Sequence, residues 1–259
     1  MRITLLAAAA LLAFGAVAHA MFALRTARPP TQPVPDRDGY LDRWQRLHGG
    51  YDPRHSLWVR GWLRLVYRAA APLARRGVAP DQLTLSVVWP SGFVLVTAAA
   101  GGRWPLLGAL LILLTGVVDT LDGAVAGLTG RASRWGYLLD SLVDRLADLT
   151  IVGALVLLGA AQAWGVAVGA GILLQEYARA RGANAGAGEV EVVTVSERPT
   201  RIIVGIVGLI VAGVLPVYAE VAAGLALIVL GALTAGGLLQ LLIVLHRRLS
   251  VPPPPGAPR

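Results

Sequence analysis

The strongest constraint on the fold is a succession of apolar runs, each long enough to cross a lipid bilayer. A segment in lipid must satisfy its backbone hydrogen bonds internally, so runs of about 20 apolar residues predict membrane-spanning α-helices. A mean hydropathy of +0.64 over 259 residues agrees with an all-α integral membrane protein. Six helices, forming one bundle, are expected near residues 83–101, 104–126, 134–160, 163–182, 201–219 and 221–245.

The distribution of arginine predicts the orientation of these helices. The chain carries a net charge of +8 and contains neither lysine nor cysteine, which excludes disulfides and thiolate chemistry. Its arginines gather at alternate connections and after the last apolar run, so the positive-inside rule places both ends of the six-helix unit in the cytoplasm. We expect a multi-pass protein of the plasma membrane, whose basic charge meets anionic membrane lipids and not nucleic acid.

The region before the bundle divides into three segments. Residues 1–24 are apolar and contain Ala18-His19-Ala20, which resembles a signal-peptidase site. Three interpretations stay open for them: an uncleaved anchor, a cleaved signal, or a start mis-assigned ahead of Met21. The proline- and arginine-rich residues 25–56 are predicted to form an extended cytoplasmic linker.

An amphipathic helix is expected over residues 57–79. Arg60, Arg64 and Arg68 recur every four positions, and Trp58 and Trp62 fall on another face. A basic helix that carries tryptophan suits the headgroup plane of a membrane. The six-helix domain would then occupy residues 80–248, and the proline-rich residues 249–259 would form a tail.

Four aspartates stand where a membrane helix should exclude them. Asp119 and Asp122 are three residues apart and Asp140 and Asp144 four apart, so each pair shares one helix face. Carboxylates at such depth are costly and indicate a functional site. Four together need cations, and oxygen ligands suit hard ions such as Mg²⁺ or Mn²⁺, of which this set could hold two. Two such ions are a recurrent device for phosphoryl displacement.

The aspartates lie in a pattern that resembles the signature of the CDP-alcohol phosphatidyltransferase family, D-x2-D-G-x2-A-R-x8-G-x3-D-x3-D. The segment Pro80-Asp81-Gln82-Leu83-Thr84 is similar to another motif of the family, with Asp81 in place of asparagine. One residue departs: the arginine that follows Ala126 in the family is Gly127 here. The matching residues are Asp119, Asp122, Gly123, Ala126, Gly136, Asp140 and Asp144.

This resemblance, to class I members such as phosphatidylinositol phosphate and phosphatidylglycerol phosphate synthases, implies an activity. A phosphatidyl group would pass from a CDP-linked lipid, CDP-diacylglycerol, to an alcohol, with release of CMP. The resemblance implies that the four aspartates bind metal, that Asp144 is also the general base, and that the protein is a homodimer. Arg131 or Arg134 could take the place of the missing arginine, or these two residues could serve only to set the orientation of the helices in the membrane. The residues implied in donor binding are Asp81, Thr84, Gly123, Ala126, Arg131, Arg134 and Gly136.

Arginines between the fourth and fifth helices suggest a small polar acceptor that carries a phosphate. Guanidinium groups suit phosphate, and similar arginines in the family bind inositol phosphate or glycerol phosphate. The same charges could instead serve topology alone. The residues concerned are Arg179, Arg181, Arg198 and Arg201.

Two other functions stay open. A cation transporter would also place carboxylates within membrane helices, although transport sites usually lie near the midplane between repeated halves. A catalytically inactive member of the family would explain Gly127, but it would have no reason to retain four costly aspartates. The acceptor alcohol, which could also be serine or a second lipid, is not fixed by these residues.

Overall fold

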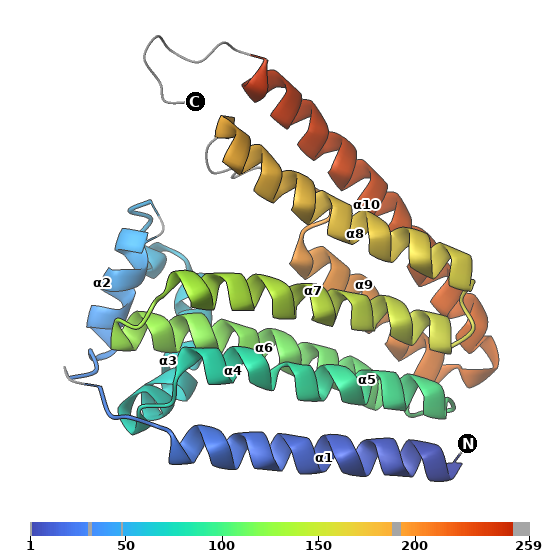
Figure 1. Ribbon diagram of the computed structural model, residues 1–259, viewed down its shortest axis with the longest axis horizontal. Helices are drawn as coiled ribbons and strands as arrows, with labels where there is room; N and C mark the ends of the chain where they lie inside the picture. The colour runs from blue at the N-terminus through green and yellow to red at the C-terminus, as the bar shows by residue number, and fades with distance from the viewer. Residues whose placement is uncertain (1, 31–32, 48, 188–192, 251–259) are drawn as a thin grey trace. The chain divides into compact units, whose positions relative to one another are not determined.

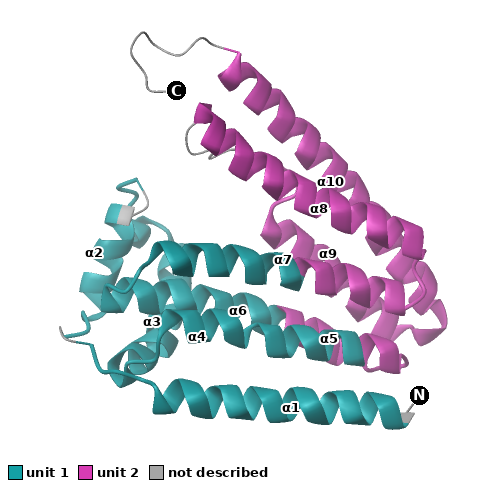
Figure 2. Ribbon diagram, in the orientation of Figure 1, with its two compact units in different colours: residues 1–96, 113–147 teal, residues 97–112, 148–259 magenta. Residues whose placement is uncertain are grey.

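The computed structural model describes residues 2–30, 33–47, 49–187 and 193–250, and every regular element within these ranges is helical (Figure 1). Residues 251–259 of the predicted tail lie outside the described residues. The chain forms two compact units, shown in two colours in Figure 2. Unit 1 comprises residues 1–96 and 113–147, and unit 2 comprises residues 97–112 and 148–259.

The helices follow the predicted apolar runs closely, and the first run is divided at Val87 into two helices. The α-helices are α1 (Arg2–Arg25), α2 (Arg37–Leu47), α3 (Leu57–Arg76), α4 (Pro80–Ser86), α5 (Val88–Ala100), α6 (Pro105–Thr129), α7 (Arg134–Leu157), α8 (Gln162–Gly182), α9 (Arg198–Val214) and α10 (Ala219–Leu249). Short turns η1 (Pro53–His55), η2 (Ala183–Ala187) and η3 (Pro216–Tyr218) accompany them.

Four stretches of the described helices are long and apolar enough to cross a membrane: Ile3–Arg25, Pro80–Ala100, Pro105–Thr129 and Pro216–Leu249. The prediction of an all-helical membrane protein is therefore confirmed. The count of six spans is not established by these helices alone. Helix α7 carries several charged side chains, α8 ends in a charged segment, and α9 has 17 residues.

In unit 1, α3 packs one face against the rest of the unit and leaves another exposed. Leu63, Val66 and Ala70 of α3 are buried in a cluster that includes Val125 of α6. On its other side α3 exposes Trp58, whose exposed fraction is 90%. The amphipathic helix predicted from the sequence is present, and its position in the headgroup plane remains a prediction.

The extended linker predicted over residues 25–56 is wrong for α2. Tyr40 and Leu41 of this helix are 6% and 2% exposed and belong to the same buried cluster as α3 and α6. Asp36 provides an N-terminal cap, because its carboxylate accepts a hydrogen bond from the Gly39 amide at 2.9 Å. The N-terminal cap and the packing together stabilise α2, although the proline- and arginine-rich composition of residues 25–56 favoured an extended segment.

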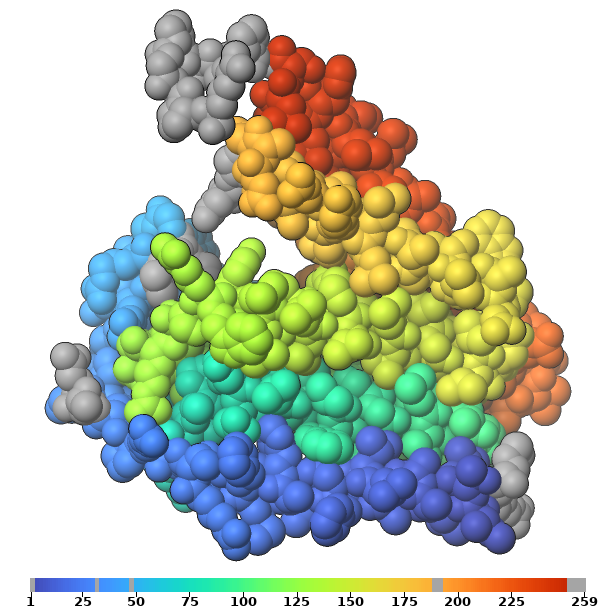
Figure 3. Space-filling view, in the orientation of Figure 1, coloured from blue at the N-terminus to red at the C-terminus, as the bar shows by residue number. Residues whose placement is uncertain are grey.

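Helix α1 packs against α4 and the start of α5, as the space-filling view shows (Figure 3). The Trp89 ring lies against Gly15, and the Leu12 side chain lies against Gly92. The His19 ring is hydrogen-bonded through Nε2 to the Gln82 carbonyl at 2.8 Å. Helix α1 is thus packed within unit 1.

In unit 2, α10 packs against both α8 and α9, and glycines allow the close approach. Gly171 of α8 faces Thr234 of α10, and Gly182 faces Leu245. At the end of α10, which is 31 residues long, the Arg248 guanidinium donates to the Ala187 carbonyl at 3.2 Å.

Gly77 is expected to be the most sensitive glycine of unit 1. It ends α3 with φ of 77°, and an added Cβ would collide with the backbone of Arg28. We predict that Gly77→Ala lowers the free energy of unfolding by about 2 kcal/mol or more, from left-handed strain plus the clash. Thermal unfolding in detergent measures the change.

Gly61 supplies the matched control, since it lies within α3 and an added Cβ would meet nothing within 4 Å. Gly61→Ala should leave stability unchanged or raise it by roughly 0.5–1 kcal/mol, because alanine is the better helix former. Equal stability of the two variants would contradict the close packing of Gly77 on Arg28.

Candidate metal and substrate site

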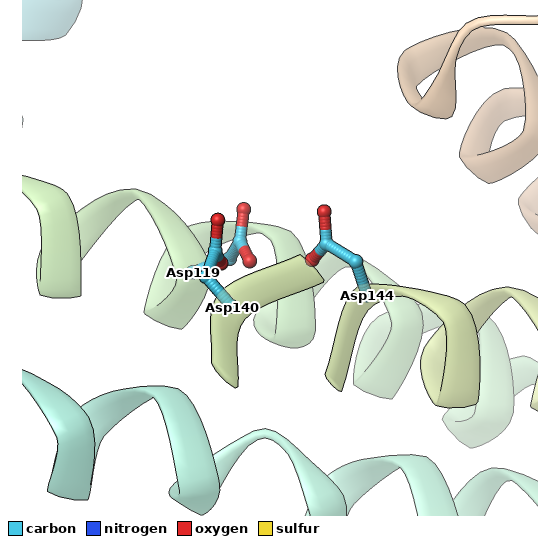
Figure 4. A group of neighbouring side chains, drawn as sticks. All are labelled: Asp119, Asp140 and Asp144. Carbon is cyan, nitrogen blue, oxygen red and sulfur yellow. The ribbon is translucent and has the colours of Figure 1, made fainter. Parts of the chain in front are cut away.

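Three of the four aspartates converge in unit 1. Asp119 on α6 and Asp140 and Asp144 on α7 bring carboxylate oxygens within 4.8 Å of one another. Figure 4 shows the three side chains projecting to the same side of the two helices. All three are partly buried, so an uncompensated cluster would be strongly repulsive. Hard oxygen ligands at this spacing fit a divalent cation such as Mg²⁺ or Mn²⁺.

Asp122, one turn after Asp119 on α6, is more deeply placed, with 7% of its surface exposed. Its carboxylate accepts a short hydrogen bond from the Thr84 hydroxyl of α4. Beside it, Gly136 lies close to Asp81, and an added Cβ would be 3.2 Å from the Asp81 carboxylate. Thr84 and Asp81, both predicted to serve donor binding, line a cavity together with Asp122 and Asp140, and Thr84 is hydrogen-bonded to Asp122.

Two cavities open on the aspartates within unit 1. The larger, of about 760 Å³, is lined by Tyr40, Arg43, Trp44, Trp58, Val59, Trp62, Leu63, Asp119, Thr120, Asp122, Gly123, Ala124, Gly127 and Asp140. The smaller, of about 190 Å³, is lined by Pro80, Asp81, Thr84, Asp122, Gly123, Ala126, Arg131, Ala132, Ser133, Gly136, Tyr137 and Asp140. Four aromatic side chains line the larger cavity, whereas Asp81, Thr84, Arg131 and Ser133 are among the residues that line the smaller one.

All the residues predicted to bind the donor, except Arg134, line the smaller cavity. Gly123 lines both, while Ala126, Gly136 and Arg131 line the smaller one. The Arg131 guanidinium donates to the carbonyls of Gly77 at 3.3 Å and of Arg28 at 2.7 Å. Arg134 is exposed at the start of α7 and lines neither cavity.

The arginines predicted to bind the acceptor lie in unit 2, and two of them form internal ion pairs. Arg179 contacts Glu197 at 2.8 Å, and Arg201 contacts Asp148 at 3.3 Å. The side chains of Arg201 and Asp148 are each 1% exposed. Arg181 is exposed near the end of α8, and Arg198 is the first residue of α9.

Glu197 organises the connection between α8 and α9. Burial raises the pKa of its carboxyl, but hydrogen bonds from Thr194 and the charge of Arg179 outweigh this and leave the pKa below its usual value. The backbone amide and hydroxyl of Thr194 both donate to this carboxylate at 2.8 Å. An ionised Glu197 therefore holds Arg179 beside the start of α9.

The sequence reasoning missed the contribution of α2 to the larger cavity. Tyr40, Arg43 and Trp44 all line it, although the segment was expected to be extended. A signal was present, because Pro35-Asp36 is a helix-start pattern. Apolar residues at 40, 41 and 44 then follow with helical spacing.

Clustered carboxylates on apolar helices, beside a cavity with aromatic walls, fit a class: metal-dependent enzymes that act on the phosphate groups of lipids. A family model described as CDP-alcohol phosphatidyltransferase matches residues 78–235. The chain belongs to this family. It is an enzyme of phospholipid biosynthesis that transfers a phosphatidyl group from a CDP-linked lipid to an alcohol, releases CMP and uses a divalent cation.

The chain is also similar to proteins named as members of this family. An archaetidylinositol phosphate synthase of Pyrococcus horikoshii is 32% identical over 53% of this chain and 72% of its own length. The corresponding protein of Methanothermobacter thermautotrophicus is 33% identical over 71% of this chain and 92% of its own. A Mycobacterium tuberculosis phosphatidylinositol phosphate synthase, solved with manganese and citrate, shares the fold, with 23% identity, a TM-score of 0.57 and coverage of 70% and 88%.

Proposed function

We propose that the donor is CDP-diacylglycerol and that the acceptor is a phosphorylated alcohol of the inositol phosphate type. The observation that carries transfer chemistry is the convergence of Asp119, Asp140 and Asp144. The names of the two archaeal relatives support the acceptor, and the mycobacterial structure has also been solved with CDP-DAG, at 23% identity and a TM-score of 0.53. Arginines around the α8–α9 connection suit a phosphate.

Each residue of the site has a proposed task. Asp119, Asp140 and Asp144 would hold the cation, together with Asp122, whose carboxylate Thr84 orients. Bound divalent cations, two in this proposal, supply positive charge that neutralises the donor diphosphate and improves CMP as a leaving group. Asp144 takes the proton from the acceptor hydroxyl as that oxygen attacks the phosphorus of the phosphatidyl group. The P–O bond to CMP breaks in the same displacement.

The membrane arrangement is also a proposal. It comprises six spans with both ends in the cytoplasm, α3 in the headgroup plane, and a homodimer in the plasma membrane. The supporting observations are the alternate arginine clusters and the exposed Trp58 of α3. The packing of α1 on Trp89 supports an uncleaved anchor over a cleaved signal, because cleavage would uncover that side chain.

The function is tested by CMP release from purified protein in detergent, with CDP-diacylglycerol, Mg²⁺ or Mn²⁺ and a panel of acceptors. We expect release that depends on inositol phosphate. Release with glycerol phosphate, serine or a lipid alcohol instead would refute the proposed acceptor and keep the class. Cation flux in vesicles without CMP release would favour a transporter. Absence of both activities would favour an inactive protein.

Removal of the metal is expected to abolish transfer. EDTA should stop CMP release and added Mn²⁺ should restore it, since the carboxylates of Asp119, Asp140 and Asp144 form an oxygen-only ligand set. Asp140→Asn should weaken Mn²⁺ binding, measured by paramagnetic resonance without turnover. Unchanged Mn²⁺ binding in this variant would remove Asp140 from the ligand set.

A further inference from the structure

Arg43 of α2 occupies a position in the larger cavity that the reaction described above does not yet use. Asp119, Asp122 and Asp140 are among the residues that line this cavity. Among the described residues that line it, Arg43 is the sole cation. A guanidinium beside a cluster that itself needs positive charge is placed to share an anionic ligand with bound cations.

The Arg43 side chain is available for such a ligand. Within the described part of the chain, no hydrogen bond or ion pair engages its guanidinium. The neighbouring Asp42 pairs instead with Arg54, at 2.7 Å. Arg131 differs, because its guanidinium already donates to two backbone carbonyls.

Gly127 and Gly130 leave room for Arg43. The guanidinium lies next to Gly130, where an added Cβ would be 3.9 Å from Nη2. Gly127, one turn earlier on α6, also lines the cavity, and a Cβ added there would meet nothing within 4 Å. Position 127 thus faces open space on the side of the cavity where Arg43 supplies the charge.

The residues that line the cavity indicate which of the two substrates supplies the anionic group that Arg43 would bind. Tyr40 and Trp44 of α2 and Trp58 and Trp62 of α3 line it. Aromatic side chains suit a ligand that joins a flat base or acyl chains to a charged group. A small polar acceptor has no apolar group to pack against these side chains, whereas a nucleotide-linked lipid has both a base and acyl chains.

We infer that Arg43 binds the diphosphate of the CDP-linked donor, from the side of the cavity that Gly127 leaves open. This inference rests on the proposed donor. Helix α2 is held in place beside the cavity, because Leu41 is buried in the same cluster as residues of α3 and α6. A forked guanidinium can engage two phosphate oxygens at once, which a single ammonium cannot do.

The test measures binding of CDP in the presence of Mg²⁺ by titration calorimetry on the full-length protein in detergent, so that no turnover is needed. Arg43→Ala should weaken CDP binding about ten- to hundredfold, the range for loss of hydrogen bonds to a charged group. Arg43→Lys should recover part of the affinity. Arg46→Ala, one turn further along the same helix and exposed, should bind as the wild type does.

A second variant supplies a rescue. Arg43→Ala combined with Gly127→Arg should regain CDP affinity, because position 127 has open space for a side chain that reaches the same ligand. Should Arg43→Ala unfold, Arg43→Gln, which keeps the length and removes the charge, replaces it. Wild-type CDP binding in the charge-free variant would overturn the inference.

Steady-state kinetics show whether Arg43 binds the diphosphate of the donor or the phosphate of the acceptor. Arg43→Ala should raise the KM for CDP-diacylglycerol and leave the KM for the acceptor unchanged. A raised acceptor KM with an unchanged donor KM would assign Arg43 to the acceptor phosphate and overturn the inference. Absence of transfer by wild-type protein, with CDP binding that still depends on Arg43, would refute the proposed transfer alone.

Discussion

Asp144→Asn is expected to reduce CMP release by about two to four orders of magnitude, the usual contribution of a general base. Asparagine is nearly isosteric but cannot accept the acceptor's proton. Asp144 lies on α7 with a carboxylate oxygen within 4.8 Å of those of Asp119 and Asp140, the residues proposed to hold the cation. CDP binding should persist within a few-fold, since the other carboxylates remain. Radiolabelled CMP release and calorimetry measure the two quantities.

Asp38→Asn is the control for this exchange. Asp38 lies on α2 with 64% of its side chain exposed and contacts Arg37 at 3.7 Å. The variant should transfer at the wild-type rate. Wild-type turnover by Asp144→Asn would exclude Asp144 as the base, and joint loss of CDP and Mn²⁺ binding would reduce its role to metal ligation.

Asp148→Asn should be the most destabilising single substitution of those proposed, at about 3–5 kcal/mol, the range for breaking a buried ion pair. The Arg201 guanidinium lies 3.3 Å from Asp148 and 3.5 Å from Glu176. Loss of the carboxylate would leave a guanidinium that is 1% exposed and whose ion pair among the described residues is the one with Glu176. Thermal unfolding in detergent should show the loss, and Asp38→Asn should shift the midpoint little.

The double variant Asp148→Leu/Arg201→Met distinguishes stability from function. Apolar replacement of both partners should restore most of the stability, because neither charge is then buried alone. If Arg201 binds the acceptor, the double variant should remain folded and show a raised acceptor KM. A double variant as unstable as Asp148→Asn would show that the ion pair is not the cause of the instability.

Much of the fold and the site could be predicted from local sequence. The apolar runs predicted helices α6 to α10, because an apolar run of about 20 residues favours a helix in a bilayer. The spacings of three and four residues placed the aspartates on two helix faces, and three of them converge. The break at Val87 was not predicted, although Pro90 marks it: proline has no amide N–H to donate to the Ser86 carbonyl, and α4 ends at Ser86.

What the sequence did not show depends on contacts between distant segments. Helix α2 is polar overall, and its burial of Tyr40 and Leu41 depends on α3 and α6. The hydrogen bond from Thr84 to Asp122 joins residues 38 positions apart, so spacing could not separate Asp122 from the other aspartates. The ion pairs of Arg179 and Arg201 are equally non-local, and the sequence suggested only phosphate binding or topology for them.

The length of α10 has a consequence for the bilayer around the enzyme. Its 31 residues give a helix of about 46 Å, against about 30 Å of hydrocarbon. A tilt of about 20° shortens its span only to about 43 Å. If α10 crosses the bilayer, roughly two turns of it extend into the headgroups or beyond, and the end that carries Arg247 and Arg248 suits that position. The acyl-chain length of the membrane, which fixes its thickness, then sets how far this end stands clear of the lipid.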